Sequence, residues 1–393
     1  MKTKFTYTAV IILVLLISAW NWSLSLNVAE KPIDQPTVAE PNNLLKEAIK
    51  KAEEGLAPAQ VSLGEMYYNG QGVPQDYKEA IKWFTKAAEQ GDQRAQFKLG
   101  YIYHEGEGIP QDYKEAVKWY TKVAEQGDQR AQFNLGYIYH EGEGVPQDYK
   151  EAIKWFTKAA EQGNQRAQFK LGYIYHEGEG VPQDYKEAVK WYTKAAAQDD
   201  ADAQYCLGHM YRNGQGVPQD YKEAIKWFTK AAEQNLAPSQ CLVGLMYANG
   251  EGVPQYYKGA VKWWIKAAEQ GNAFAQIKLG EMYYEGQCVP LNYMEAIKWW
   301  TKAAYQGNAD AQFYLGVMYM KGNGVIEDPT EAYKWLLLAN MNGTNITVDG
   351  HKLGEYKYRL TIYDEKWNPN PHVLNAEQIA EAQKRAKEFV ESK

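Results

Sequence analysis

Residues 92–127 read DQRAQFKLGYIYHEGEGIPQDYKEAVKWYTKVAEQG, and this unit returns along the chain at a step of 36 residues. The stretches 128–163 and 164–198 repeat it almost letter for letter. The ends of the units fall on one lattice, at Gly55, Gly91, Gly127, Gly163, Asp199, Asn235, Gly271, Gly307 and Gly343. A period of about 20–50 residues is typical of arrays whose units bury their apolar faces only against their neighbours. The sequence therefore predicts a solenoid, a class of protein that usually binds rather than catalyses.

The first half of the unit predicts a helix that ends in a tight turn. Asp92 is a good N-cap, and Ala95, Leu99 and Ile102 follow at steps of four and three, which places an apolar stripe on one side of a helix. The stretch GEGIP at 106–110 then ends this helix, because paired glycines weaken it and proline forces its predecessor into an extended conformation.

The second half predicts a second helix that packs back on the first. Asp112 is expected to cap it, with Glu115 completing a capping box. Gly127 is expected to end it in left-handed geometry. The predicted buried side consists of Ala116, Trp119, Val123 and Ala124. Each repeat is thus expected to be a helix–turn–helix.

This register divides the chain into four parts. Residues 44–343 are expected to form the solenoid, with a leading helix at 43–54 and eight helix pairs over 56–342. Residues 344–393 form a C-terminal segment, in which 344–373 fit no repeat and a polar helix at 375–391 is expected to cover the last exposed face of the core. Residues 1–25 and 26–43 precede the array.

The N-terminal segment has the features of an export signal. Lys2 and Lys4 precede an apolar run at 9–17, and small residues follow. The run is short for a bilayer span of about 20 residues, which favours a cleaved signal peptide over an uncleaved anchor. Residues 26–43 are polar and contain three prolines, which is typical of a flexible linker.

Composition narrows the partners. Hydrophobic residues make up 45% of the chain, enough for a packed core. The net charge of -6 does not favour nucleic acid or an anionic membrane surface as the main partner. The three cysteines cannot form a disulfide framework, although a bridge between Cys206 and Cys241 stays open because they occupy nearly matching places in successive repeats.

The repeating residues resemble the Sel1-like repeat, a relative of the tetratricopeptide repeat. The resemblance covers about residues 44–343 and rests on Ala95, Leu99, Gly100, Tyr103, Gly106, Gly108, Pro110, Asp112, Ala116, Trp119, Ala124 and Gly127. It implies an all-α fold, an α/α solenoid wound as a right-handed superhelix with a concave inner surface. It also implies an adaptor that assembles complexes, in bacteria often at the cell envelope or in host contact.

With the export signal, this predicts a periplasmic or secreted protein, held in the inner membrane only if its N-terminal segment is retained. The pattern departs from the family at Asp199 and Asn235, which replace glycine, at Cys288, which replaces a loop glycine, and at Ile326, which replaces proline. We expect altered turns there.

Comparison of the copies of the first helix predicts the binding face. Some positions, such as Ala95, Gln96 and Leu99, hardly change between copies, whereas three positions spaced i, i+4 and i+7 vary and share one stripe of the helix. Arginine and tyrosine are enriched at interface hot spots. We therefore expect a partner protein or an extended peptide to bind the concave face through Arg94, Lys98, Tyr101, Arg130, Asn134, Tyr137, Arg166, Lys170, Tyr173 and His209. The alternative is that these residues are ordinary solvated surface.

Signs of catalysis are few. His104 with Glu105 and Glu107 recurs in two further repeats, but this spacing matches no standard metal-ligand pair, so neither a metal site nor a cofactor is predicted. Some members of the resembled family have been linked to β-lactam binding or hydrolysis, which makes a β-lactam-binding or cell-wall hydrolase activity the alternative function. None of the six serines begins the Ser-x-x-Lys arrangement of penicillin-reactive enzymes, and we predict no catalytic residue.

Overall fold

The computed structural model describes residues 41–343, 347–348, 351–352 and 376–392. The predicted signal segment 1–25, the linker as far as residue 40 and most of 344–375 lie outside these residues. The chain divides within α4 into two compact units, Met1–Lys86 and Ala87–Lys393. In the first unit, α2 (Pro41–Glu53) precedes α3 (Ala57–Asn69) and the start of α4 (Tyr77–Glu89). The leading helix thus begins two residues before its predicted start.

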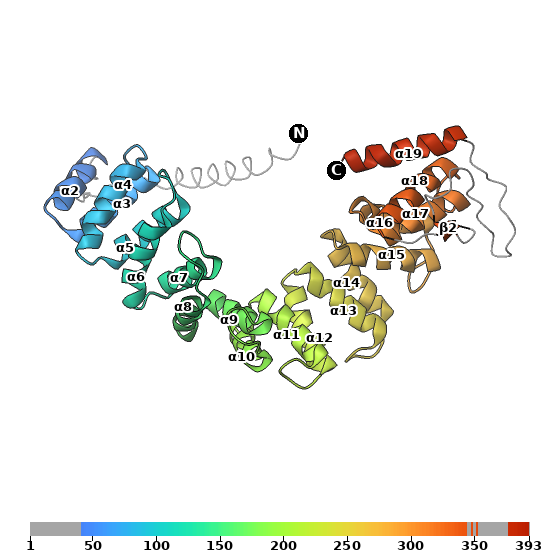
Figure 1. The fold of residues 1–393 in the computed structure, drawn as a ribbon, viewed down its shortest axis with the longest axis horizontal. Helices are drawn as coiled ribbons and strands as arrows, with labels where there is room; N and C mark the ends of the chain where they lie inside the picture. Colours follow the sequence, from blue (N-terminus) through green and yellow to red (C-terminus); the bar gives the residue numbers. More distant parts are fainter. Residues whose placement is uncertain (1–40, 344–346, 349–350, 353–375, 393) are drawn as a thin grey trace, which may run out of the picture. The chain divides into compact units, whose positions relative to one another are not determined.

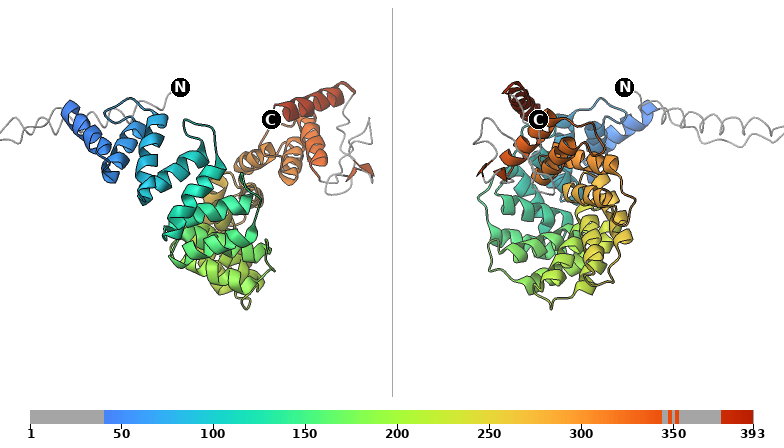
Figure 2. Two further views of the ribbon diagram at one scale, coloured as in Figure 1. Left: turned by 60° about the vertical axis from the view of Figure 1, so that its left-hand side comes forward. Right: turned by 90° about the vertical axis from the view of Figure 1, so that its right-hand side faces the viewer.

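The second unit is a row of helix pairs, drawn in Figures 1 and 2, in which consecutive helices lie side by side. The first helices of the pairs, here called the A helices, are α5 (Gln93–Glu105), α7 (Gln129–Glu141), α9 (Gln165–Glu177), α11 (Ala201–Asn213), α13 (Ala237–Asn249), α15 (Ala273–Glu285) and α17 (Ala309–Lys321). The second, or B helices, are α6 (Tyr113–Glu125), α8 (Tyr149–Glu161), α10 (Tyr185–Ala196), α12 (Tyr221–Glu233), α14 (Tyr257–Glu269), α16 (Tyr293–Tyr305) and α18 (Pro329–Met341). The predicted all-α solenoid of helix–turn–helix repeats is confirmed.

The chain after α18 holds two short strands and a last helix. Strands β1 (Thr347–Val348) and β2 (His351–Lys352) pair antiparallel. The helix α19 (Ala376–Glu391) packs on α18, where Ile379 and Ala382 join a buried cluster with Leu336. The cover predicted for the last core face is therefore present. Within the described residues, no helix combines the length and apolarity needed to cross a bilayer.

Caps define both ends of the A helices. The Asp92 carboxylate accepts a hydrogen bond from the Ala95 backbone N–H at 3.0 Å, as predicted. Gly106 ends α5 with a φ of 72°, and its N–H donates to the Ile102 carbonyl. This left-handed conformation favours glycine because a side chain would clash with the backbone.

The predicted capping box of the B helices is only half formed. The Asp112 carboxylate accepts hydrogen bonds from the N–H groups of Lys114 and Glu115. The Asp112 N–H, however, donates to the Tyr103 carbonyl at 2.9 Å, so it is not available to the Glu115 side chain. Glu115 instead pairs with Lys118 at 2.9 Å. The capping-box prediction is wrong in that part, because the turn already satisfies the donor.

Three departures from glycine leave the turn geometry unchanged. Asp199, Asn235 and Cys288 have φ values of 62°, 70° and 61°, within the left-handed region that glycine occupies in other repeats. The expectation of altered turns is wrong at these positions. Packing of the flanking helices holds the backbone there, at a cost of about 1–2 kcal/mol for a side chain in this conformation.

The core depends on close contact between the A and B helices of one repeat. Ala131, Leu135 and Ile138 of α7 are fully buried, as are the equivalent residues of α5. Gly136 lies against the ring of Phe156 from α8, and a Cβ at this glycine would come within 2.5 Å of that ring. The same contact joins Gly100 to Tyr120 and Gly172 to Tyr192. The glycine in the middle of each of these three A helices therefore makes room for the large ring of its own B helix.

Buried glutamines join each repeat to the one before it. The Gln96 Nε2 donates to the Ala88 carbonyl at 2.9 Å, and its Oε1 accepts from Gln126 Nε2 at 3.1 Å. The bond to the alanine carbonyl recurs at Gln132, Gln168, Gln204, Gln240, Gln276 and Gln312, with distances of 2.9–3.2 Å. The second bond recurs at each of them within 2.7–3.0 Å. Each glutamine thus satisfies a carbonyl at the end of the preceding B helix.

Candidate functional site

The predicted stripe lies on the side of the A helices that faces away from the buried core. Arg94, Arg130 and Arg166 are exposed at the start of α5, α7 and α9. Lys98, Asn134 and Lys170 follow one turn later and are partly buried. Tyr101 and Tyr137 are partly buried, and Tyr173 is exposed. Each of the three helices therefore presents a similar rung, formed by a cation, a second polar residue and a tyrosine.

The arginines differ in how far their charge is neutralised. Arg130 Nη2 lies 2.8 Å from Asp128 Oδ2, and the guanidinium lies over the Phe97 ring at 4.4 Å. Arg94 lies 4.0 Å from Asp92. Although burial opposes it, the hydrogen bonds from Arg130 and Ala131 lower the pKa of Asp128. These two arginines are thus held by the caps of their own helices.

Arg166 is the exception among the three. Asn164 replaces the capping aspartate of the other two helices and accepts a hydrogen bond from the Ala167 N–H. Within the described part of the chain, Arg166 has no ion-pair partner. Lys170, one turn later, places its Nζ 5.7 Å from the Tyr137 ring and 6.0 Å from the Tyr173 ring. The third rung therefore carries the most available positive charge.

The tyrosines lie between this basic end and an acidic end of the A helices. Partial burial, followed by the charges of Glu107 and Glu105, raises the pKa of Tyr101. Burial together with Glu179 and Glu177 does the same for the pKa of Tyr173. The phenols stay protonated at neutral pH and can donate hydrogen bonds. The face thus runs from cations through tyrosines to carboxylates.

His209, the tenth predicted residue, has different surroundings. Its ring packs edge-on against Tyr205 at 4.6 Å and Phe228 at 5.0 Å. Burial, followed by the charges of Arg212 and His176, lowers the pKa of His209. It therefore sits partly inside the helix pair rather than projecting like the tyrosines.

Histidines and glutamates at the acidic end link successive repeats. His140 Nδ1 lies 2.8 Å from Glu141 Oε1, and its Nε2 lies 2.7 Å from Glu179 Oε2 in the next repeat. His104 and Glu143 approach at 3.3 Å in the same way, and Arg212 and Glu251 pair at 3.1 Å. Sequence reasoning missed these contacts, although the partners recur at a fixed offset of 39 residues. In the described residues no group of three such side chains is arranged to hold a metal ion.

The stripe changes character in the later repeats. Leu242 and Leu245 take the lysine and tyrosine positions on α13, and Phe274, 43% exposed, takes the arginine position on α15. On α17 the Tyr314 ring stacks on Trp300 from α16 at 4.6 Å. The rungs that begin with an arginine are therefore confined to α5, α7 and α9 within the A helices of the second unit.

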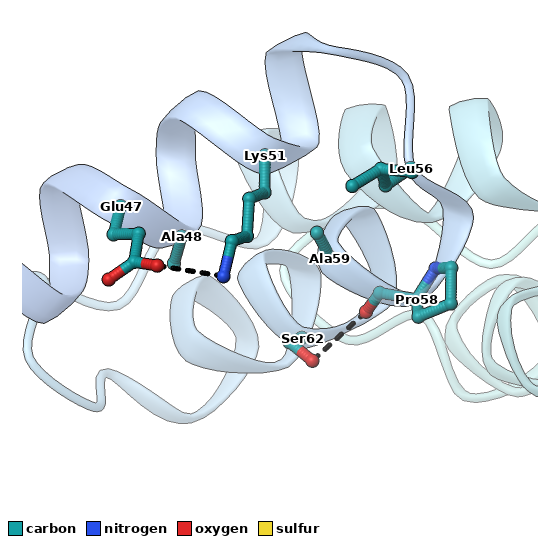
Figure 3. Close-up of a pocket in the computed structure, with 7 residues that line it drawn as sticks. All are labelled: Glu47, Ala48, Lys51, Leu56, Pro58, Ala59 and Ser62. Atoms are coloured by element: carbon teal, nitrogen blue, oxygen red, sulfur yellow. Dashed lines mark hydrogen bonds and ion pairs between the residues drawn. The ribbon is translucent and has the colours of Figure 1, made fainter.

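The first unit contains a cavity of about 460 Å³ between α2 and α3, shown in Figure 3. Glu47, Ala48, Lys51, Leu56, Pro58, Ala59 and Ser62 line it. Pro58 and Ser62 hold the arginine and lysine positions of the stripe in this repeat. The Ser62 hydroxyl donates to the Pro58 carbonyl at 3.0 Å, and Lys51 pairs with Glu47 at 2.8 Å. Among the described residues, Glu47 and Lys51 pair with each other, and neither is in hydrogen-bond contact with the Ser62 hydroxyl.

The cysteines are free thiols. The bridge between Cys206 and Cys241, left open by the sequence, is not formed in this structure. Burial raises the pKa of Cys206 to about 11 and that of Cys241 to about 12. Because the thiolate is the reactive form, both are poor nucleophiles at neutral pH.

Comparison with known proteins agrees with the repeat architecture. The Sel1 repeat family model matches residues 57–92, 93–128, 129–164, 165–200, 201–236, 237–272, 273–308 and 309–344. Among curated protein sequences, no relative matches the chain.

Two solved structures are similar in sequence and fold. One is c5321, a protective antigen present in uropathogenic Escherichia coli strains, with 41% identity and a TM-score of 0.72 over 77% of this chain. This chain spans 65% of the length of that protein. The other is a Sel1 repeat protein from Oxalobacter formigenes, with 34% identity and a TM-score of 0.64, covering 82% of this chain and 96% of that one. The chain therefore belongs to the Sel1-repeat family, with eight consecutive repeats.

Proposed function

We propose that this protein is a non-catalytic scaffold that binds a partner protein or an extended peptide across α5, α7 and α9. Sel1-repeat solenoids are commonly protein-interaction scaffolds and are generally non-catalytic. The partner and the activity of this particular chain are inferred from its own surface.

One observation carries the proposal. Three successive A helices present the same order of side chains, in which an exposed arginine precedes a polar residue and a tyrosine. The backbone under these side chains is fixed by buried residues such as Leu99 and Leu135. A rigid aromatic group beside an arginine binds a partner at little cost in conformational entropy. Repetition of the rung allows one ligand to contact several rungs at once.

The described residues give little support to the alternative function, β-lactam binding or cell-wall hydrolysis. The Ser62 and Ser392 hydroxyls donate to the carbonyls of Pro58 and Phe389, and Ser239 is fully buried. None of the three is in hydrogen-bond contact with a histidine or lysine among the described residues, as an acylating serine requires. We therefore do not propose this activity.

We further propose that the scaffold acts outside the cytoplasm. The support is the sequence of residues 1–25, in which basic residues precede a short apolar run. Intact-mass measurement of the protein purified from each cell fraction tests this. Loss of about 19 or 25 residues in a soluble envelope fraction is expected, and the full-length mass in the cytoplasm would contradict it.

Affinity capture from the envelope fraction tests the scaffold. The variant Tyr101→Ala, Tyr137→Ala, Tyr173→Ala is compared with wild type, using quantitative mass spectrometry. The matched control is Lys114→Ala, Lys150→Ala, Lys186→Ala, which changes exposed residues of the B helices in the same three repeats. Circular dichroism shows whether all three proteins fold alike.

We expect one partner to be recovered with wild type and the control and at least tenfold less with the tyrosine variant. Calorimetric titration of the purified partner should then repeat this order of affinities. Equal recovery by the tyrosine variant would show that these tyrosines are ordinary surface.

A further inference from the structure

A histidine at the end of α7 joins two of the repeats that carry the arginine rungs. His140 Nδ1 lies 2.8 Å from Glu141 Oε1, and its Nε2 lies 2.7 Å from Glu179 Oε2. Glu141 is the neighbour of His140 on α7, whereas Glu179 lies in the turn after α9. The His140 side chain is buried. It therefore bridges two repeats from a position that is largely shielded from water.

His104 forms the equivalent bridge one repeat earlier. Its Nδ1 lies 2.8 Å from Glu105 Oε1, and its Nε2 lies 3.3 Å from Glu143 Oε2 in the turn after α7. The two bridges thus connect α5 to the repeat of α7, and α7 to the repeat of α9. The rung tyrosines Tyr101 and Tyr137 precede these histidines by one helical turn on the same helices. The bridges therefore lie directly beside the proposed binding face.

The surroundings of His140 require a doubly protonated ring. An ionised carboxylate only accepts hydrogen bonds, whereas a neutral imidazole has one N–H donor and one acceptor nitrogen. Both ring nitrogens of His140 face carboxylate oxygens, so the ring can donate to both only as the imidazolium cation. Imidazole gains and loses this charge between about pH 5 and 8. In the neutral ring, one nitrogen would turn a lone pair toward a carboxylate.

The B helices supply only neutral groups to these rings. The His140 ring packs edge-on against Tyr149 of α8 at 5.5 Å. The His104 ring packs in the same way against Tyr113 of α6 at 5.5 Å and lies 6.3 Å from Tyr120. A tyrosine phenol is uncharged over the range in which imidazole titrates. These contacts position the rings but do not compensate for the carboxylates.

The same carboxylates also act on the tyrosine of the third rung. Burial raises the pKa of Tyr173 on α9, and the charges of three carboxylates add to this effect. They are Glu179, Glu177 and Glu141. Two of them, Glu141 and Glu179, face His140. Loss of the imidazolium charge therefore leaves carboxylates that repel one another near the third rung.

The next two repeats contain natural counterparts of the bridge. Arg212 holds the histidine position on α11, and its Nη2 lies 3.1 Å from Glu251 Oε2 in the turn after α13. This bridge keeps its charge because arginine is always protonated in proteins. For His176 on α9, Gln215 stands where the other bridges have glutamate. The bridges that need a charged histidine are thus the two that join the arginine rungs.

We propose that protonation of His104 and His140 couples the repeats of α5, α7 and α9, so that the binding face is held in one arrangement at mildly acidic pH and loosens as the pH rises. The sign follows from the charge, because the folded bridges need the protonated ring and their stabilisation is lost when the proton leaves. This inference specifies the regulation of the binding face, and its consequence for binding rests on the proposed scaffold function.

Hydrogen exchange of the full chain, measured by mass spectrometry at about pH 5.5 and about pH 8, tests the coupling. In the turn after α9, the Asp184 N–H donates to the Tyr175 carbonyl at 2.8 Å. The Tyr256 N–H makes the same bond to the Tyr247 carbonyl at 2.8 Å in the turn after α13. The two turns therefore have equivalent amides, one beside a histidine bridge and the other beside the arginine bridge.

We expect the exchange protection of residues 178–184, corrected for the intrinsic rate at each pH, to be at least fivefold greater at the acidic pH. Protection of residues 250–256 should change less than twofold. A change in the stability of the whole array would affect both turns alike, so the comparison isolates the histidine bridge. Peptides that extend past Ile153 or Val189 distinguish the otherwise identical copies of the turn. Equal changes in the two turns would overturn the proposal.

Variants of His140 test the cause. His140→Arg copies the bridge of α11 and should keep the protection of residues 178–184 at the higher pH within twofold of its value at the lower pH. His140→Gln cannot carry the charge and should show low protection at both. If His140→Gln is protected as well as wild type at the acidic pH, the proposal is wrong.

The link to binding has a separate test. Capture from the envelope fraction is repeated at both pH values with wild type and with the double variant His104→Arg, His140→Arg. Wild type should recover at least threefold more partner at the acidic pH, and the arginine variant should recover similar amounts at both. Equal recovery by wild type at the two pH values, or a pH dependence that the arginine variant retains, would overturn the regulation of binding.

The two proposals fail separately, because no partner enters the exchange measurement. If no partner is captured at either pH, the scaffold role fails, while the protection of residues 178–184 still decides the coupling. If a partner is captured through the rung tyrosines but residues 178–184 exchange alike at both pH values, the scaffold stands and the coupling is wrong.

Discussion

The substitution Gly136→Ala tests whether the central glycine of an A helix is required by packing. The new Cβ would lie 2.5 Å from Cδ1 and 2.7 Å from Cε1 of Phe156, a fully buried ring. Forcing extra volume into a packed core typically costs about 1–3 kcal/mol. Alanine also favours the helix by about 1 kcal/mol over glycine. The difference is a net loss of about 0–2 kcal/mol. Because the ring belongs to the facing helix and has no free space to enter, we expect the upper half of this range, about 1–2 kcal/mol.

Gly259→Ala provides the control, because its helix propensity changes by the same amount in a different environment. The three atoms nearest to its Cβ would all belong to the ring of Tyr256, which is 49% exposed and can turn away. The equivalent position holds glutamate in the neighbouring repeats, at Glu223 and Glu295. We expect Gly259→Ala to raise the stability by about 0.5–1 kcal/mol.

Urea unfolding followed by circular dichroism measures both effects, with hydrogen exchange of α7 and α8 as a local readout where the array does not unfold in one step. A Cβ at Gly316 would likewise come within 2.7 Å of Leu336 in the last repeat, so the glycine is needed there even where the facing side chain is aliphatic. A Gly136→Ala protein as stable as wild type would refute the packing argument.

Three further outcomes are expected. Gln204→Ala leaves the buried Ala196 carbonyl without its hydrogen-bond donor and removes the hydrogen bond from Gln234. The free energy of unfolding should therefore fall by about 1–3 kcal/mol. The control Gln129→Ala, at an exposed site, should change the urea midpoint little. Because the pKa of His209 is lowered in the folded protein, the unfolded chain binds a proton at this residue more readily. The free energy of unfolding should therefore fall as the pH drops below about 6.5. His209→Phe should lessen this fall, as measured by urea midpoints between pH 5 and 8. Cys288 is exposed, whereas burial raises the thiol pKa values of Cys206 and Cys241. Ellman's reagent should therefore label one thiol rapidly in the native protein and three thiols in urea. Rapid labelling of all three thiols in the native protein would contradict the burial of Cys206 and Cys241.

Local chemistry made much of the repeat predictable. The caps at Asp92 and Asp112, the turn at Gly106 and the buried positions Leu99 and Trp119 follow from spacing within one repeat, and the structure confirms them. Such features depend on residues close in the sequence, where backbone preferences and helical periodicity act directly.

Contacts between repeats were not predictable in the same way. Gln96 hardly changes between copies, but its partner is the Ala88 carbonyl of the preceding helix, and a backbone acceptor leaves no mark in the sequence. The spacing of the histidines near the turn named no partner for them, whereas His140 reaches Glu179 in the next repeat. Each of these depends on how two helices are placed in space.

The predicted binding residues stay a prediction as to function, although their placement can be described. The sequence placed the arginines, lysines and tyrosines of α5, α7 and α9 on one stripe, and each of them is exposed or partly buried. Sequence reasoning did not show that Arg166 lacks the acidic cap neighbour, although Asn164 marks the difference. It also grouped His209 with the tyrosines, whereas the Tyr205 and Phe228 rings hold it.

The separation of fixed and variable positions explains how one surface can change without loss of the fold. From α9 to α11 the stripe changes from Arg166, Lys170 and Tyr173 to Asp202, Cys206 and His209. The buried glutamine keeps both of its bonds across this change, at Gln168 and at Gln204. Since the backbone is held by these bonds and by the glycine contacts, selection can alter the outer side chains one repeat at a time. Duplication of a repeat that already carries a binding rung then lengthens the site by about one helix spacing, without the need for a new fold.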